Sequence, residues 1–188
     1  MDIATSPTNP EGNPELADAA PMPKEPPLIL RKDYTPFGWL IPQIRLHFDL
    51  GIEETRVTSH LTIEPNPAAA PTTQLRLNGD RLEAASVTVD GEPAQYSVDG
   101  DDLVVMMPNM APNPGASHEV QIATTINPST NTALMGLYAS NGMLCTQCES
   151  EGFRRITFFP DRPDVLSTYS VRMVGDKALF PILLCNGN

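Results

Sequence analysis

Apolar and polar side chains alternate with a two-residue period in stretch after stretch of this sequence. The clearest stretch runs from Gln43 to Leu50, where Ile44, Leu46, Phe48 and Leu50 are apolar and the residues between them are polar or charged. The same period returns at 57–63, 75–77, 87–89, 120–126 and 169–173. Because successive side chains of an extended strand point to opposite faces, this period predicts half-buried β-strands.

Turn-forming dipeptides separate these stretches: Asn78-Gly79, Asp90-Gly91, Asp99-Gly100, Asn141-Gly142 and Gly175-Asp176. They favour the tight reversals of hairpins, and Val98–Asp101 is the clearest case. No window carries the apolar spacing of an amphipathic helix, so we expect at most a helical turn or two near Asp164–Ser167. The sequence therefore predicts an all-β fold, an antiparallel β-sandwich or a curved sheet, without fixing the order of its strands.

The first thirty residues differ from the rest in composition. Eight of the twenty prolines lie in residues 1–36, with almost no large apolar residue before Leu28. Such a stretch cannot offset its own ordering entropy, so residues 1–30 are expected to be an extended or disordered tail. Residues 31–188 are expected to form one β domain. The apolar residues before Cys185 are expected to form a strand, and the turn signal at Cys185–Asn188 follows it directly. A hairpin would ordinarily continue there, so we expect the sequence to be part of a longer one.

The charge and the cysteine content exclude several classes of partner. The net charge is -11 at pH 7, which repels phosphate backbones and anionic lipid headgroups, so neither nucleic acid nor a membrane is expected to bind. The sequence shows neither a signal peptide at its start nor an apolar run long enough for a membrane helix. Three cysteines, an odd number, fit a reducing compartment. We expect a cytoplasmic protein.

Two patterns that suggest metal binding are incomplete. Cys145 and Cys148 have the spacing of half a zinc site, but the remaining candidates are Cys185 and scattered histidines, whereas a structural zinc site needs four ligands. His118-Glu119 begins like a His-Glu-x-x-His motif, yet Ile122 stands where the second histidine is required, and the stretch alternates as a strand. We therefore assign neither a metal ligand nor a catalytic residue in this sequence.

The polar stretch around residues 145–164 carries the candidate binding residues. On an extended segment Gln147 and Glu149 would point the same way, and their oxygens could receive an ammonium group; a solvated loop is the alternative. Glu149 and Glu151 could also be read as an acid/base pair, although nothing in the sequence raises the pKa of either. The nearby charged residues could bind an anion, but such short spacing favours mutual ion pairs: Arg154, Arg155, Asp161, Arg162 and Asp164.

At these residues the sequence resembles the bacterial branch of the aminopeptidase N family of zinc metallopeptidases. The resemblance is carried by these segments: Asn127-Pro128, Asn131–Tyr138, Cys145–Glu149, Glu151–Phe159, Asp161–Val165 and Leu183–Asn188. Residues 33–36 and 44–50 match the start of the family more loosely, so the resemblance covers about residues 31–188. Pro160 and Cys185 depart from the family pattern.

The resemblance implies a saddle-like β domain, the first of four, that packs on a catalytic domain and lends one loop to the active site. It places Gln147 and Glu149 on that loop, where they would help to hold the free α-amine of a peptide substrate. The catalytic zinc, with its His-Glu-x-x-His motif, would belong to the catalytic domain of the full-length enzyme, so this chain alone is expected to be inactive.

Two other readings of the sequence remain open. The chain could be a free-standing β-sandwich module, derived from such an enzyme, that works as a binding or interaction protein. It could also be a small Cys-x-x-Cys metal or redox protein, although that reading leaves the rest of the family signature unexplained. The sequence does not indicate which N-terminal residue a substrate would carry, or the oligomeric state.

Overall fold

The computed structural model describes residues 30–108 and 117–187 of the chain. The chain divides into two compact units, Met1–Tyr34 and Thr35–Asn188. In the first unit the described residues form one turn of 3-10 helix, η1 (Arg31–Asp33). The predicted tail, residues 1–30, lies outside the described residues except for Leu30. Everything below concerns the second unit.

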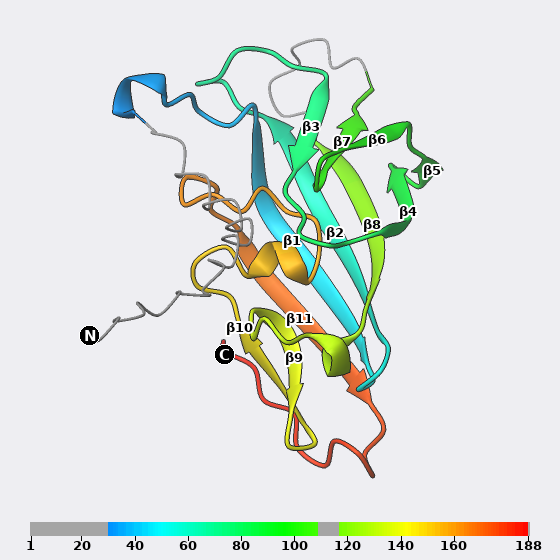
Figure 1. Cartoon of the computed structure of the whole chain (residues 1–188). Coiled ribbons are helices and arrows are strands. Elements are labelled where there is room, and N and C mark those ends of the chain that lie inside the picture. Colours follow the sequence, from blue (N-terminus) through cyan, green and yellow to red (C-terminus); the bar gives the residue numbers. More distant parts are fainter. Residues whose placement is uncertain (1–29, 109–116, 188) are drawn as a thin grey trace, which may run out of the picture. The chain divides into compact units, whose positions relative to one another are not determined.

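A six-stranded sheet forms most of this unit (Figure 1). Its strands lie in the order β11-β1-β2-β8-β4-β5. Their bounds are β1 (Trp39–Leu50), β2 (Thr55–Pro65), β4 (Ala84–Val89), β5 (Glu92–Pro93), β8 (His118–Ile126) and β11 (Thr168–Gly175). Neighbouring strands are antiparallel except β1 and β11, which are parallel. The all-β prediction is therefore confirmed, and the sheet is mixed at one edge.

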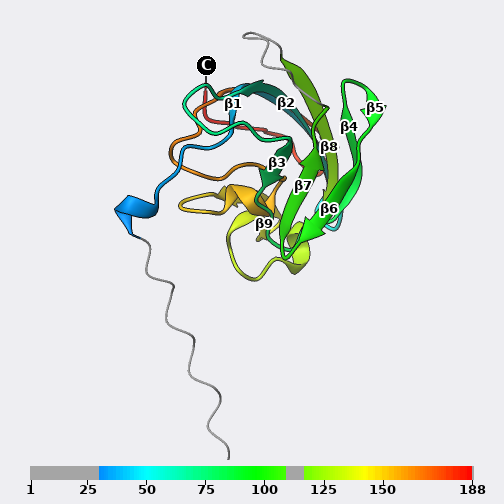
Figure 2. The ribbon, with the colours of Figure 1, turned by 90° about the horizontal axis from the view of Figure 1, so that it is seen from above.

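Two smaller sheets complete the unit. One has the order β3-β7-β6, with β3 (Gln74–Leu77), β6 (Tyr96–Asp99) and β7 (Asp102–Met106). Figure 2 shows it facing the inner side of the curved large sheet. The other is the hairpin of β9 (Gly136–Ser140) and β10 (Met143–Gln147). Two further 3-10 turns, η2 (Pro128–Thr130) and η3 (Phe153–Arg155), flank this hairpin in sequence.

The core lies between the large sheet and the β3-β7-β6 sheet, and the predicted alternation explains it. On β1 the side chains of Ile44, Leu46 and Phe48 are buried, and on β2 and β8 the same period buries residues such as Leu61 and Ile122. The register slips between Leu40 and Gln43, so that Ile41 is buried before the slip and Ile44 after it. A bulge of this kind is where a strand proline such as Pro42 is tolerated, because the ladder hydrogen bonds are interrupted there.

Three of the predicted turns are two-residue hairpin loops. Asp90-Gly91 joins β4 to β5, Gly100-Asp101 joins β6 to β7, and Asn141-Gly142 joins β9 to β10. Asp90, Gly91, Asn141 and Gly142 all have the positive φ angles that such turns require. The hairpin predicted at Val98–Asp101 is thus confirmed.

Two local predictions were wrong. Residues 164–167 form a turn and irregular chain, and the 3-10 turns lie elsewhere. The apolar residues before Cys185 form no strand in the described part of the chain, and Leu184 is 87% exposed. Apolar composition alone predicted that strand, but a strand also needs a hydrogen-bonded neighbour, and none of the described strands pairs with this segment. None of the described helices is long or apolar enough to span a bilayer.

Candidate functional site

The candidate binding residues lie on the loop that joins β10 to η3. Gln147 is the last residue of β10, where it pairs with Gly136 of β9, and residues 148–152 lead from there into η3. The side chains of Gln147 and Glu149 are both exposed. The structure therefore brings these two residues to one solvent-facing loop, although it does not test their role.

The local geometry differs from the extended segment that the alternation suggested. The strand ends at Gln147, and the chain turns at Glu149. The Gln147 amide Nε2 donates a hydrogen bond of 3.1 Å to the backbone oxygen of Glu149, so this side chain braces the turn. Its Oε1 accepts no hydrogen bond from the residues that the structure describes. Among the described residues no hydrogen bond or ion pair engages the Glu149 carboxylate. The loop thus presents a carboxylate and an amide oxygen to solvent.

Gly152 allows the loop to close on itself. Its backbone N–H donates a hydrogen bond of 2.9 Å to the Cys148 oxygen. A Cβ atom at position 152 would lie 2.4 Å from the Gln147 backbone oxygen and 2.8 Å from the Cys148 Cα, closer than real contacts allow. Only glycine fits this approach, so the conformation of the loop depends on residue 152.

Arg154 holds the end of the loop through two carboxylates. Its NH2 group lies 3.3 Å from the Glu151 carboxylate, and its Nε donates to Asp161 Oδ2 at 3.1 Å. Asp161 also accepts from the Arg154 backbone N–H at 3.3 Å, and its backbone oxygen accepts from the guanidinium at 3.1 Å. The predicted ion pairing between nearby charged residues is therefore present here. Glu151 forms an ion pair with Arg154 and no acid/base pair with Glu149.

Three aromatic rings pack beneath the loop. Phe153 contacts Phe159 and Tyr169 edge-on, with ring centroids 5.2 and 6.0 Å apart. Tyr169 is 51% exposed, and the partial burial of its side chain, with smaller contributions from Asp161 and Cys148, raises its pKa to about 12. The pKa of the Cys148 thiol is also raised, mainly by burial and to a smaller extent by the charge of Asp161. The loop is thus anchored on a partly buried apolar base next to a carboxylate.

The histidines and cysteines of the incomplete metal patterns do not converge. His60 lies 3.3 Å from Glu119, which also pairs with Arg45, and His118 pairs with Asp90 on the far edge of the sheet. The pairing with Arg45 is the largest cause of the lowered pKa of Glu119. All three cysteines are free. In the part of the chain that the structure describes, no three His, Cys, Asp or Glu side chains form a group able to hold a metal.

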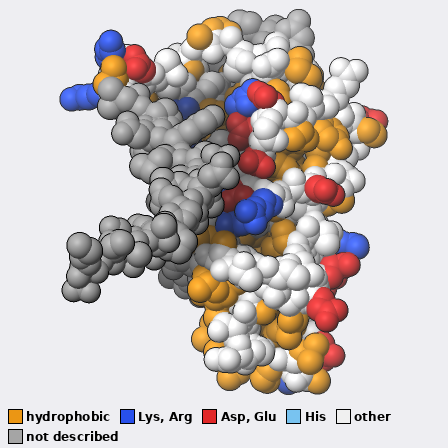
Figure 3. Space-filling view, in the orientation of Figure 1, with side chains coloured by type: hydrophobic (Ala, Val, Ile, Leu, Met, Phe, Trp, Pro, Cys, Tyr) orange, Lys and Arg blue, Asp and Glu red, His pale blue; other side chains and the backbone are white. Residues whose placement is uncertain are grey.

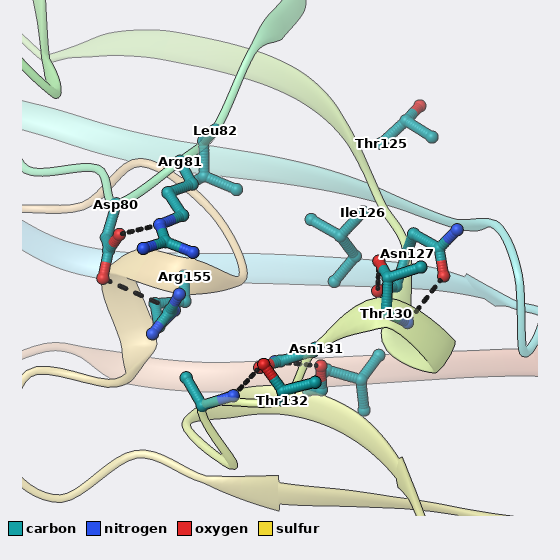
Figure 4. Close-up of a pocket in the computed structure, with 12 residues that line it drawn as sticks. Asp80, Arg81, Leu82, Thr125, Ile126, Asn127, Thr130, Asn131, Thr132 and Arg155 are labelled. Carbon is teal, nitrogen blue, oxygen red and sulfur yellow. Dashed lines mark hydrogen bonds and ion pairs between the residues drawn. The ribbon is translucent and has the colours of Figure 1, made fainter.

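A separate pocket lies on the other side of η3, and sequence reasoning missed it (Figure 4). Arg155 lies 3.4 Å from Asp80, which belongs to the connection between β3 and β4. These residues are 75 positions apart, so no sequence spacing could have paired them. The other wall is the chain around η2. Tyr169 was likewise predicted only as a strand residue, because its neighbours Phe153 and Asp161 meet it only in the fold.

The sequence matches a known protein family over most of its length. Residues 34–188 match the family model described as the peptidase M1 N-terminal domain. Aminopeptidase N of Caulobacter vibrioides is 46% identical over 169 residues, which cover 87% of this chain and 18% of that protein. The chain thus spans less than a fifth of the length of this relative.

Solved structures show the same fold. Legionella pneumophila aminopeptidase A in complex with aspartic acid superposes with a TM-score of 0.73 at 26% identity, covering 83% of this chain and 18% of that one. The M1 zinc metallopeptidase from Deinococcus radiodurans superposes with a TM-score of 0.63 at 17% identity, covering 75% of this chain and 33% of that one. The second likeness concerns the fold alone.

Proposed function

The chain belongs to the peptidase M1 N-terminal domain family, and from this membership we propose that it is the accessory domain of a zinc-dependent aminopeptidase. In this proposal the domain supplies the loop between β10 and η3 to the active site of the full-length enzyme. There Glu149 and Gln147 bind the free α-amine of a peptide substrate. The 188-residue chain alone is catalytically inactive.

The observation that carries this proposal is the exposed Glu149 carboxylate on a braced loop. The other carboxylates around the loop are occupied, since Glu151 and Asp161 both pair with Arg154. Glu149 has no such partner among the described residues, so its negative charge is available to a ligand. The Gln147 Oε1 offers a second acceptor two residues away.

The chemistry of an N-terminal amine suits this pair. The α-amine of a peptide has a pKa of about 7.7–8.0, so it is largely protonated near neutral pH and carries N–H donors. A carboxylate and an amide oxygen accept such donors, and the hydrogen bond to the carboxylate is charge-assisted. An acylated or internal amide nitrogen carries no charge and binds more weakly, so the loop selects peptides with a free N-terminus.

The zinc of such an enzyme is proposed for a part of the protein outside this chain. The described residues contain no cluster of ligands that fits the metal. The chemistry of peptide-bond cleavage is therefore assigned to the catalytic domain. The role of this chain is to orient the substrate by its amine.

Replacing Glu149 in the full-length enzyme tests the proposal. Glu149→Gln keeps the size of the side chain but removes its charge, so we expect kcat/KM for a peptide with a free N-terminus to fall about 10- to 100-fold, the range of a charge-assisted hydrogen bond. Zinc content should stay unchanged. Steady-state kinetics and metal analysis measure the two quantities.

Two controls separate a specific role from a general effect of charge. Glu53→Gln removes an exposed carboxylate from the turn between β1 and β2 and should leave the kinetics unchanged. An inhibitor that lacks the α-amine should bind the Glu149→Gln enzyme as well as it binds the unmodified one. Unchanged kinetics in the Glu149→Gln enzyme would refute the role assigned to this residue.

A further inference from the structure

The pocket beside η3 is enclosed by three parts of the chain and has a volume of about 290 Å³. The connection between β3 and β4 forms one side, the end of β8 and the chain around η2 form the opposite side, and η3 contributes Arg155 (Figure 4). Its apolar walls come from Leu82, Ile126 and Leu137. Thr125 and Thr132 add hydroxyl groups at its rim.

Arg155 is the unusual group in this pocket. Its side chain is only 16% exposed, and the one ion pair that it makes with the described residues runs from Nε to Asp80 Oδ2 over 3.4 Å. In the described part of the chain, no hydrogen bond engages the two terminal nitrogens of this guanidinium. A guanidinium carries five N–H donors. None of the buried side-chain nitrogens of the described residues lacks a hydrogen-bond partner, so the terminal nitrogens of Arg155 reach solvent and can donate to a ligand in the pocket.

A second guanidinium strengthens the positive charge of the pocket. Arg81 lies 3.9 Å from the other Asp80 oxygen, and its side chain is 84% exposed. Figure 4 shows both arginines directed toward Asp80 on the same side of the pocket. Two guanidinium groups against one carboxylate leave a net charge of one positive unit, which matches a monovalent anionic group.

The pocket is preformed rather than loosely arranged. The Asp80 backbone N–H donates to the Arg154 oxygen at 3.0 Å, which fixes the β3–β4 connection against η3. Asn131 holds the opposite wall by donating to the backbone oxygens of Met135 and Leu137 at 2.8 and 2.9 Å. A Cβ at Gly136 would lie 2.7 Å from the Arg155 Cβ, so these two segments are in close contact. Preorganised donors bind a ligand at a lower entropic cost.

We propose that this pocket is a binding site for a small carboxylate ligand, held by Arg155 and Arg81. The planar guanidinium matches the two oxygens of a carboxylate, the single net positive charge balances a carboxylate, and the apolar walls accommodate a short carbon chain. This site is distinct from the loop of Gln147 and Glu149, and its existence does not depend on the proposed peptidase role.

Titration of the 188-residue chain with defined anions tests the site. Acetate and butyrate are added at constant ionic strength, with sodium chloride as the balancing salt and inorganic phosphate as a separate arm. Backbone amide and arginine Nε–H signals are followed by NMR. We expect saturable shifts in the millimolar range that are confined to the pocket, with residues 80–82, 125–133 and 155 most affected.

Variants connect the shifts to the two arginines. Arg155→Lys keeps the charge but loses the planar fork, and we expect it to weaken butyrate binding about 10-fold or more. Arg81→Ala changes a side chain that is 84% exposed, so it provides the test if Arg155→Lys proves unstable; it should weaken binding by about 3- to 10-fold. Arg56→Ala removes an exposed arginine of β2 and should leave the affinity unchanged.

Three results would overturn the proposal. They are the absence of saturable shifts with either carboxylate, equal affinity in the unmodified chain and the Arg81→Ala variant, and tighter binding of phosphate than of butyrate. The first would show that the pocket holds only water, the second that the arginines do not bind the ligand, and the third that the site does not select carboxylates.

Discussion

Asp161 connects more parts of the candidate site than any neighbouring residue does. Its carboxylate accepts hydrogen bonds from the side chain and the backbone of Arg154, and its backbone N–H donates to Asn78 at 3.2 Å. The same charge contributes to the raised pKa values of Tyr169 and Cys148. One side chain therefore fixes the loop and influences the groups beneath it.

Replacing Asp161 with Asn should lower both the stability of the domain and the pKa of Tyr169. The variant loses a partly buried, charge-assisted contact, so the free energy of unfolding should fall by about 1–3 kcal/mol, measured by urea denaturation. The pKa of Tyr169 should fall from about 12 but stay above that of a free tyrosine, because burial is its largest cause. Phenolate absorbance measures this pKa, with Tyr169→Phe to assign the signal.

The same pKa shift predicts how stability depends on pH. A tyrosine whose pKa is about 12 when folded and about 10 when unfolded stabilises the folded state fully below pH 10. This contribution is lost as the pH rises from 10 to 12, because the unfolded chain releases the proton first. Asp101→Asn, an exposed change in the β6–β7 turn, is the control. An unchanged phenolate titration in Asp161→Asn would contradict the role of the carboxylate.

Among the elements, the loop after β10 is the one whose conformation depends most directly on a single glycine, Gly152. Gly152→Ala places a methyl group 2.4 Å from the Gln147 oxygen, so backbone must shift and the domain should lose about 1–3 kcal/mol of stability. In the full-length enzyme this shift should also displace Glu149 and raise KM for free-amine peptides. Urea denaturation and kinetics test the two effects.

Gly100→Asn is the control for this element. Gly100 also lies in a tight turn, but a Cβ there would meet nothing within 4 Å, and Asn tolerates its positive φ angle. Its stability and kinetics should stay near those of the unmodified protein. A Gly152→Ala protein with normal stability would show that the loop can relax without cost.

The elements also show what local pattern can and cannot predict. Two-residue alternation located β1, β2 and β8, and Asp-Gly and Asn-Gly pairs located the hairpin turns, because both signals are local. The parallel pairing of β11 with β1 was not predictable, since it joins residues such as Ile44 and Tyr169 across most of the chain. The role proposed for Gln147 and Glu149 rests on the family resemblance. The pairing of Asp80 with Arg155 could be recognised only in the folded structure.

At the scale of the whole molecule, large apolar side chains remain exposed after folding. Leu166, Ile182 and Leu184 are 83%, 75% and 87% exposed, and β11 is an edge strand of the large sheet. Figure 3 shows hydrophobic side chains gathered where Figure 1 places β9, β10 and the C-terminal segment. Exposed apolar surface of this extent is typical of a site that contacts another protein.

We therefore expect the isolated 188-residue chain to associate with itself as its concentration rises. Sedimentation velocity over a range of concentrations should show dimers or larger species. Replacing Ile182 and Leu184 together with Ser should shift the distribution toward monomer, whereas replacing the exposed Val98 of β6 should not. A monodisperse monomer at high concentration would count against this expectation.

The β1–β11 pair also bears on the synthesis of the protein. Ser167 Oγ donates to the Ile41 oxygen at 2.6 Å, and the eight-residue ladder that follows joins the first strand of the sheet to the last. While the chain leaves the ribosome, β1 can pair with β2 early, but its other edge stays open until β11 has emerged. During that interval the unpaired edge of β1 can form hydrogen bonds with another strand or with another chain.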